Sequence, residues 1–307
     1  MQTGSEHHAL GSHRLGPHVV GQRIVLRYLL PDGRATDVLG VCQRWGPDAV
    51  LIHTPHGEVE VPVATIVTGK PVPPRASVRQ RVPSATAERH ALSLWPHVEK
   101  VEVGDWVLRS DPAPSGRLIK RANSALALGD PGVPPAEAAA IVDEFYRASD
   151  RPTLVQVEAD SPTDEAFGAL GWPVVERSDS YFQVASLATA LRASGRRARK
   201  AQPSGGVHVA EDADHCEVVI GDGLAHGRAG IDADWVGIHA IEVTPRARRR
   251  GLAHVVVCEL LDWAGSRGAQ TAWLHVEVDN SAALALWDSM GFRTHHALRY
   301  RTAPAHA

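Results

Sequence analysis

An arginine-rich turn between a predicted strand and a predicted helix is the clearest chemical feature of the sequence. The run Val243-x-Pro245-x-x-Arg248-Arg249-Arg250-Gly251-Leu252-Ala253 follows an apolar stretch over 234–243 and precedes a helical pattern that ends at Arg267-Gly268. A helix N-terminus presents free N–H groups and the positive end of the helix dipole, and guanidinium groups bind phosphate oxygens. We therefore predict that this turn binds a phosphate-bearing ligand, with Gly251 allowing close approach of the backbone.

A second motif lies further along the chain. It reads Val278-Asp279-Asn280-Ser281-Ala282-Ala283 and leads into a helical stretch that ends at Gly291-Phe292. Together, in this order and at this spacing, the two motifs resemble those of the GCN5-related N-acetyltransferases (GNAT). The first is similar to that family's (Arg/Gln)-x-x-Gly-x-(Gly/Ala) acetyl-CoA motif, and the second to its Asn-x-x-Ala signature. The resemblance covers residues 205–303.

The resemblance implies a mixed α/β GNAT fold that transfers an acetyl group directly from acetyl-CoA to an amine, with no metal and no covalent enzyme intermediate. It also implies a bulge in the strand over 235–243, which exposes backbone N–H groups to the pantetheine arm and the thioester oxygen. The acetyl-CoA-binding residues that it implies are Ile241, Val243, Arg248, Arg249, Arg250, Gly251, Leu252, Ala253 and Asn280.

Two residues of the same strand are candidates for the base that accepts the amine proton. Alternation along a strand puts Gly237, His239 and Ile241 on one face, and the resemblance implies that this face lines the acetyl site. His239 is the first candidate, because imidazole titrates near neutral pH, and a structural core histidine is the competing interpretation. Glu242 is the second candidate, because many GNAT relatives use a glutamate near this strand.

Trp287 stands where GNAT relatives commonly have a tyrosine whose hydroxyl protonates the leaving thiolate. Indole cannot act as an acid near pH 7. Trp287 could donate its N–H to the sulfur, or it could only pack on the cofactor. This departure leaves a non-catalytic acyl-CoA sensor or scaffold open as a rival function.

A narrower resemblance concerns the acceptor. The order of a small β-barrel and two acetyltransferase-like halves resembles an actinobacterial group described as N-acetylglutamate synthases and also as histone-acetyltransferase-like proteins. Our first expectation is the α-amino group of glutamate, which would assign the chain to arginine biosynthesis, and the alternative is a protein lysine. A glutamate acceptor needs arginines that bind its carboxylate, and the candidates are Arg293, Arg299 and Arg301.

One pattern occurs twice in the C-terminal part of the chain. Residues 154–172 align without a gap with 274–292, and each segment reads as a strand, a capped helix and a Gly-aromatic stop. Where the phosphate turn should fall, the first copy has Gly129-Asp130-Pro131-Gly132-Val133-Pro134-Pro135, which contains an acid and no arginine. Its prolines lack N–H donors. We therefore predict tandem GNAT halves, of which the first, over 88–186, is degenerate.

The N-terminal part has a different pattern. Short apolar runs alternate with turn signals such as Pro31-Asp32-Gly33 over 16–70, which predicts a small all-β SH3-like barrel that could bind a protein partner. We expect a disordered tail over 1–15. The other boundaries that we expect are linkers over 71–87 and 187–204 and the acetyl-CoA-binding GNAT domain over 205–303.

Composition limits the partners. The 307 residues hold 32 Lys and Arg against 35 Asp and Glu, a formal charge of −3, so no overall positive field favours nucleic acid or an anionic membrane. Three widely separated cysteines and the lack of an apolar run of about 18 residues predict a cytoplasmic protein. The expected acceptor is a small-molecule amine or amino acid, or else a protein amine.

Overall fold

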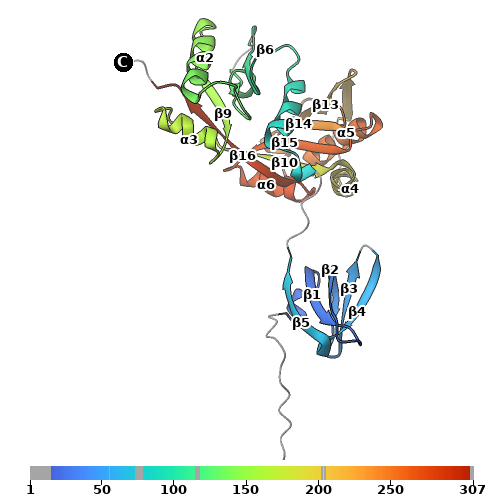
Figure 1. Cartoon of the computed structure of the whole chain (residues 1–307). Helices are drawn as coiled ribbons and strands as arrows, with labels where there is room; N and C mark the ends of the chain where they lie inside the picture. The colour runs from blue at the N-terminus through green and yellow to red at the C-terminus, as the bar shows by residue number, and fades with distance from the viewer. Residues whose placement is uncertain are drawn as a thin grey trace, which may run out of the picture. The chain divides into compact units, whose positions relative to one another are not determined.

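The computed structural model describes residues 15–54, 56–72, 79–114, 118–201, 203 and 205–304. The chain forms two compact units, Met1–Ala76 and Ser77–Ala307, and each is described by itself (Figure 1). The tail expected over 1–15 lies outside the described residues except for Leu15, which is buried in the core of the first unit. Residues 73–78 of the first expected linker also lie outside the description.

The first unit is an antiparallel sheet whose described strands follow the order β4-β3-β2-β1-β5. Alternate residues such as Ile24 and Leu26 are buried, because successive side chains of a strand point to opposite faces. The all-β fold predicted for this part of the chain is confirmed. The elements are η1 (Pro17–Val19), β1 (Arg23–Leu29), β2 (Ala35–Trp45), β3 (Ala49–Thr54), β4 (Gly57–Pro62), η2 (Val63–Thr65) and β5 (Ile66–Pro71).

The second unit is built on one mixed sheet, whose described strands follow the order β11-β12-β13-β14-β15-β10-β16-β9-β8-β7-β6. The strands are β6 (Glu99–Val103), β7 (Trp106–Ser110), β8 (Ala125–Leu126), β9 (Leu154–Glu158), β10 (Ser180–Ser186), β11 (Val207–Glu211), β12 (His215–Ile220), β13 (Ala225–Asp232), β14 (Trp235–Val243), β15 (Thr271–Glu277) and β16 (Arg293–Thr302). The helices are α1 (Ser84–Arg89), α2 (Pro135–Ala148), α3 (Pro162–Ala169), α4 (Leu187–Ala198), α5 (Leu252–Ser266) and α6 (Ser281–Asp288). Short 3-10 turns are η3 (Arg79–Arg81), η4 (His90–Leu94), η5 (Lys120–Ala122) and η6 (Pro245–Ala247). None of the helices in the described residues is long and apolar enough to cross a bilayer.

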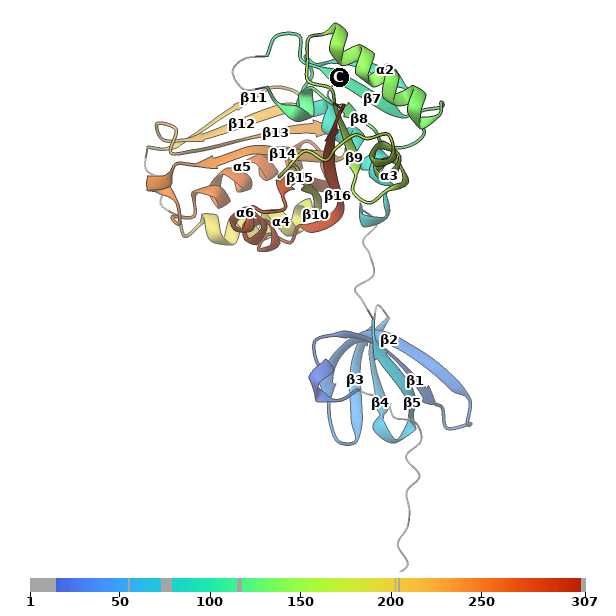
Figure 2. The same cartoon turned by 90° about the vertical axis from the view of Figure 1, so that its left-hand side faces the viewer.

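The sequence repeat appears as two halves that exchange their last strands. The first half begins at α1 and η4 and runs from β6 through β9 and α3 to β10, and the second half runs from β11 through β15 and α6 to β16. Strand β10 lies between β15 and β16, and β16 pairs with β9. Each half therefore completes the sheet of the other, which makes the tandem halves one folded body (Figure 2).

The segment expected as a second linker begins with helix α4. Leu187 and Ala190 are buried in the core that α4 shares with α5, whereas Arg196 and Lys200 at its C-terminal end are exposed. A helix with one apolar side gains stability by burying that side against a core. The basic residues at the end of α4 make its apolar side difficult to recognise from the sequence. The segment over 187–198 is a packed helix rather than a linker.

The chain before β6 is also folded, although part of it was expected to be linker. Helix α1 and turn η4 bury Ala87, Ala91 and Leu94 in one cluster with Trp235 of β14 and Trp273 of β15. The opposite face of these two strands packs against α5. The first half therefore covers the face of the second half on which His239 was expected to act.

Candidate active site

Strand β14 carries a bulge. Its pairing with β13 passes from His239, opposite Arg228, to Glu242, opposite His226, so two residues of β14 oppose one residue of β13. The first of the two, Ala240, has a φ of 51°. A bulge disrupts the ladder locally and leaves an extra residue unpaired. The bulge implied by the GNAT resemblance is thus present.

The bulge changes which face each following side chain occupies. Ile238 is buried in the core beneath α5, whereas His239 faces away, with its ring 6.1 Å from that of Trp95. After the bulge, Ile241 packs on the α5 core instead of sharing the face of His239. The prediction that strict alternation puts His239 and Ile241 on one face is therefore wrong, because the bulge inserts a residue. Alternation restarted at Ile241 puts Glu242 on the face of His239.

Strands β14 and β15 open beyond a short parallel ladder. They pair only from Trp235 opposite Thr271 to Gly237 opposite Trp273 in the described residues. Continued by two residues, this register would set His239 opposite His275. Both side chains therefore flank the opening on the face that α1 and η4 cover.

On one side of this opening lies a hollow that we call the donor groove. It is lined by the end of β14, the turn into α5 and one side of α6, and it brings together four residues expected to bind acetyl-CoA, namely Ile241, Val243, Arg248 and Ala253. Glu242 also lines it. The groove thus joins the predicted phosphate turn to the bulged strand.

The turn into α5 uses two left-handed residues. Arg249 has a φ of 65° and Gly251, the N-cap of α5, has a φ of 80°. The side chains of Arg248, Arg249 and Arg250 are exposed, and Nε of Arg248 donates to the carbonyl oxygen of Val243 at 3.2 Å. The first N–H groups of a helix have no intrahelical acceptor. The turn thus offers N–H donors and guanidinium groups to an anion.

Two residues expected to bind acetyl-CoA have side chains with structural roles. Leu252 is buried in the core beneath α5. The side-chain Oδ1 of Asn280 accepts from the backbone N–H of Ala283 at 3.1 Å and caps α6, as the N-cap preference of asparagine predicts. Leu252 therefore offers only its backbone to the donor, whereas Asn280 still offers the two N–H groups of its side-chain amide.

Trp287 lies in the core rather than in the donor groove. It is 5% exposed and contacts the ring of Phe292 at a centroid distance of 5.4 Å. The α6 residues that line the groove are Ala282, Ala283 and Leu286. This placement gives no support to the expected role of Trp287 at the thioester sulfur.

On the other side of β14 lies a second hollow, the acceptor hollow, with a volume of about 560 Å³. The first half contributes Trp95, His97 and Asp111 to its lining, and the second half contributes Glu211, Asp212, Glu217, Arg228 and His239. Glu217 pairs with Arg228 at 2.9 Å and Glu211 with Arg267 at 3.4 Å, so the remaining negative charge of the lining comes from Asp111 and Asp212. The sequence motifs gave no indication of these carboxylates, because they come from distant segments.

A smaller inner hollow adjoins it between β14 and β15. Trp95, Arg121, His239, Trp273 and His275 are among its lining residues. His239 lines both the acceptor hollow and the inner hollow. The pKa of His239 is lowered to about 4, mainly by burial and also by the charge of Arg228. His239 is therefore neutral at physiological pH.

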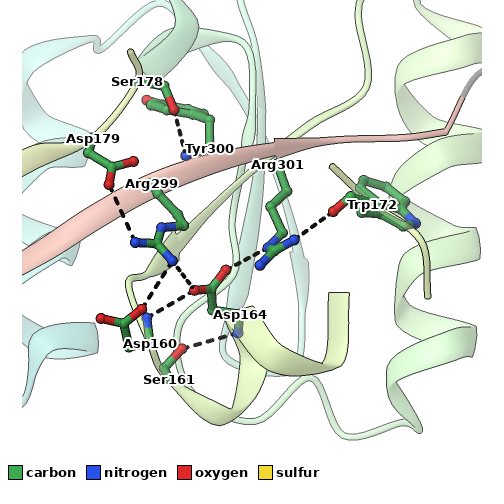
Figure 3. A network of polar contacts seen from close by, with 9 residues as sticks. All are labelled: Asp160, Ser161, Asp164, Trp172, Ser178, Asp179, Arg299, Tyr300 and Arg301. Atoms are coloured by element: carbon green, nitrogen blue, oxygen red, sulfur yellow. Dashed lines mark hydrogen bonds and ion pairs between the residues drawn. The ribbon is translucent and has the colours of Figure 1, made fainter. Parts of the chain in front are cut away.

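The three arginines expected to bind a glutamate acceptor are engaged elsewhere (Figure 3). Arg299 and Arg301 of β16 both bind the carboxylate of Asp164, at 2.8 Å and 2.5 Å. Arg293 pairs with Asp288 at the surface. None of the three lines the donor groove, the acceptor hollow or the inner hollow. The substrate role expected for them is not supported, because the carboxylates of Asp160, Asp164, Asp179 and Asp288 already pair with them.

Comparison with known proteins agrees with this architecture. Residues 85–301 match the family model described as "Probable histone acetyltransferase Rv0428c C-terminal", and residues 18–70 match "Rv0428c N-terminal Sm-like domain". The chain belongs to this Rv0428c family, within the GNAT superfamily. The second match identifies the first unit, which the sequence predicted as a small SH3-like β-barrel, as an Sm-like domain.

Individual relatives support the same assignment. The chain is 24% identical over 246 residues to the uncharacterized N-acetyltransferase YobR of Bacillus subtilis, which covers 70% of this chain and 96% of YobR. It is 41% identical over 75 residues to the [ribosomal protein bS18]-alanine N-acetyltransferase of Salmonella typhimurium, 24% of this chain and 51% of that protein, so it spans about half of that relative's length. A solved GCN5-related N-acetyltransferase from Kribbella flavida has the same fold, with a TM-score of 0.54 at 16% identity over 75% of this chain and 97% of that one. These names do not support the assignment to arginine biosynthesis.

Proposed function

We propose that the second unit transfers the acetyl group of acetyl-CoA to an amino group of a protein. The observation that carries this proposal is the position of β14 between two hollows. Its residues Ile241 and Val243 line the donor groove with the arginine-rich turn, and His239 lines the acceptor hollow. A donor and an acceptor bound on the two sides would meet at the bulge.

The donor side fits acetyl-CoA, which supplies the activated acetyl group. Arg248, Arg249, Arg250 and the first N–H groups of α5 would hold its pyrophosphate, because they combine positive charge with unpaired donors. Backbone groups at the bulge would bind the pantetheine arm and the thioester oxygen. In the first half, the corresponding turn is closed on itself, since the N–H of Asp130 donates to Asp105 and the N–H of Asp105 donates to the carbonyl oxygen of Asp130.

The acceptor side favours a cationic substrate over glutamate. Four carboxylates line the acceptor hollow, and after Glu217 pairs with Arg228 and Glu211 with Arg267, the carboxylates of Asp111 and Asp212 remain without an arginine partner among the described residues. Such a lining attracts a lysine side chain or a free amino terminus and repels the two carboxylates of glutamate. The name of the matching family, a probable histone acetyltransferase, supports the same choice.

His239 and Glu242 remain the candidates from the sequence for the base. The amine must lose a proton as it attacks the thioester carbonyl, and either side chain lies on the correct face of β14. His239 is the nearer to the acceptor hollow, which it lines, whereas Glu242 lines the donor groove.

A thiol-release assay tests the function. The full chain with acetyl-CoA should release thiol with a lysine-rich histone-type peptide and with a peptide that begins with alanine, and it should do so far more slowly with glutamate. Glutamate as the best acceptor would contradict the protein-amine assignment. Tight acetyl-CoA binding with no turnover on any amine would favour the sensor or scaffold function.

A further inference from the structure

A fully buried carboxylate from the first half lies beside the inner hollow. Glu88 of α1 has no exposed surface, and its Oε1 accepts hydrogen bonds from Nε2 of His275 at 2.8 Å and from Nε2 of His296 at 3.2 Å. Its Oε2 has no hydrogen-bond partner among the described residues. A buried carboxylate is costly unless it is paired. The two imidazoles are therefore what keeps Glu88 ionised in this position.

The charge state of Glu88 follows from the same contacts. Burial alone would raise its pKa, but the hydrogen bonds from His275 and His296, and the charge of these rings when they are protonated, outweigh this effect and hold the pKa below its ordinary value. An ionised carboxylate can only accept hydrogen bonds. Each imidazole must therefore carry a proton on the Nε2 that faces Glu88.

The two histidines differ in what their other nitrogen can do. Nδ1 of His296 contacts Nδ1 of His295 at 2.8 Å, and His296 does not line the inner hollow. His275 does line it, together with His239. With Nε2 protonated, Nδ1 of a neutral His275 keeps its lone pair, and none of the described residues donates a hydrogen bond to it.

The charges around His275 suit a base. The pKa of His275 is lowered to about 4, mainly because burial and the charge of Arg121 outweigh the opposite effect of Glu88, so the ring is neutral at physiological pH. If Nδ1 takes a proton, the new positive charge lies against the carboxylate of Glu88. His239 is less well placed to hold a proton. Among nearby charges, Arg228 has the largest effect on its pKa, and it would repel a protonated ring.

We propose that His275, oriented by Glu88, is a base of the acetyl-transfer reaction, an inference that rests on the proposed function. Nδ1 of His275 accepts the amine proton, directly or through a water, as the new C–N bond forms and the C–S bond breaks. The thiolate leaves with the electron pair of the C–S bond and takes its proton from solvent, and His275 returns its proton to solvent. Glu88 is then a positioning residue, supplied by the half that lacks the phosphate turn.

The main variant is His275→Gln. The glutamine amide can still donate to Glu88 but offers no nitrogen that accepts a proton. We expect kcat to fall about 10²–10⁴-fold, the range for a lost general base, while the Kd for acetyl-CoA measured by calorimetry changes less than about twofold. In His275→Ala, free imidazole added to the assay should restore part of the lost rate, which a structural role would not produce.

His296→Gln is the matched comparison, because His296 binds the same oxygen of Glu88 but lies outside the inner hollow. It should lower the melting temperature about as much as His275→Gln does and lower kcat much less. Glu88→Gln should lower kcat without a recovery at higher pH, because loss of the carboxylate makes His275 a weaker base.

The outcomes separate this inference from the function on which it rests. A wild-type chain that binds acetyl-CoA but acetylates no amine overturns both. An active wild type with a fully active His275→Gln overturns only the role of His275. Equal loss of kcat in His275→Gln and His296→Gln, with no rescue by imidazole, also overturns it, since the cluster would then be structural.

Discussion

His239 and His275 flank the same opening between β14 and β15, but their charged neighbours differ. A proton on His275 would lie against the carboxylate of Glu88, whereas a proton on His239 would face Arg228. A protonated imidazole next to a carboxylate is stabilised, and one next to a guanidinium is not. Although burial is the main cause that lowers the pKa of both histidines to about 4, we expect His275 to take up more of the amine proton than His239.

Substitution of His239 measures its share. If His239 is the main base, both His239→Ala and His239→Gln should lower kcat/KM about 10²–10⁴-fold with little change in melting temperature. If it mainly forms the wall between the hollows, His239→Gln should retain most of the turnover per folded molecule. Steady-state kinetics and thermal melts on both variants distinguish these results, and the position of His275 leads us to expect the second.

The lowered pKa of His239 also predicts an acid-dependent loss of stability. Its pKa is about 4 in the folded chain and about 6.5 when unfolded. Between these values the unfolded chain binds more protons, so stability falls as the pH drops from about 6.5 towards 4. His239→Gln should make the melting temperature less sensitive to pH in this window. An unchanged pH dependence would show that the ring is not buried as described.

At the scale of elements, the turn into α5 is the part of the site that its sequence predicts best. A strand, an arginine-rich turn with Gly251 and a helix are local features, so the motif indicates both the structure and the anion chemistry. The orientation of Glu242 could not be predicted in this way. It depends on a bulge that shifts the pairing with β13, and alternation counted along β14 alone gives the wrong face for Ile241.

Arg248 tests the donor groove. It lines the groove with its guanidinium exposed, and loss of one charge-assisted hydrogen bond costs about 1.5–3 kcal/mol. Arg248→Ala should therefore raise the Kd for acetyl-CoA by about ten- to a hundredfold. Asp130→Asn, at the corresponding turn of the first half, is the control and should leave the Kd unchanged. Equal effects of both changes in a calorimetric titration would contradict the assignment of the groove.

At the scale of the whole molecule, the strand exchange explains why two arginines of β16 are structural. Asp164 of α3 is 2% exposed and binds Arg299, Arg301 and the backbone N–H of Asp160 (Figure 3). The network therefore ties the last strand of the second half to a helix of the first. No local pattern reveals this, because the carboxylate and the arginines are far apart in the sequence.

Asp164→Asn should destabilise the second unit without changing the acceptor kinetics. Removing the charge takes the one carboxylate partner from Arg301 among the described residues, while Arg299 keeps Asp160 and Asp179. Breaking a buried ion pair costs about 3–5 kcal/mol. Chemical denaturation should show this loss, while KM for the acceptor measured on folded protein should stay within about twofold. A large rise in KM for the acceptor with unchanged stability would contradict this structural role and indicate that Arg299 and Arg301 bind the substrate.

The exchange of β10 and β16 also limits which parts of the chain can fold alone. The sequence repeat indicates two similar units but not which strand completes which sheet, since β10 and β16 hold equivalent places in the two halves. Without residues 180–198, the second half loses the partner of β15 and the α4 side of its core. The strand β15 would then expose an unpaired edge, which favours aggregation.

Two truncated chains test this dependence. A fragment over 77–307 keeps both halves and should fold cooperatively and bind acetyl-CoA with the Kd of the full chain, because the donor groove lies wholly within the second unit. A fragment over 205–304 keeps every residue of the arginine-rich turn but should be aggregated or unfolded and bind no acetyl-CoA. Size-exclusion chromatography, circular dichroism and calorimetry on the two fragments provide the measurement. If the shorter fragment is a folded monomer that binds acetyl-CoA as tightly as the longer one, the first half is dispensable for the donor site, and its β10 does not complete the sheet in the way that the strand order requires.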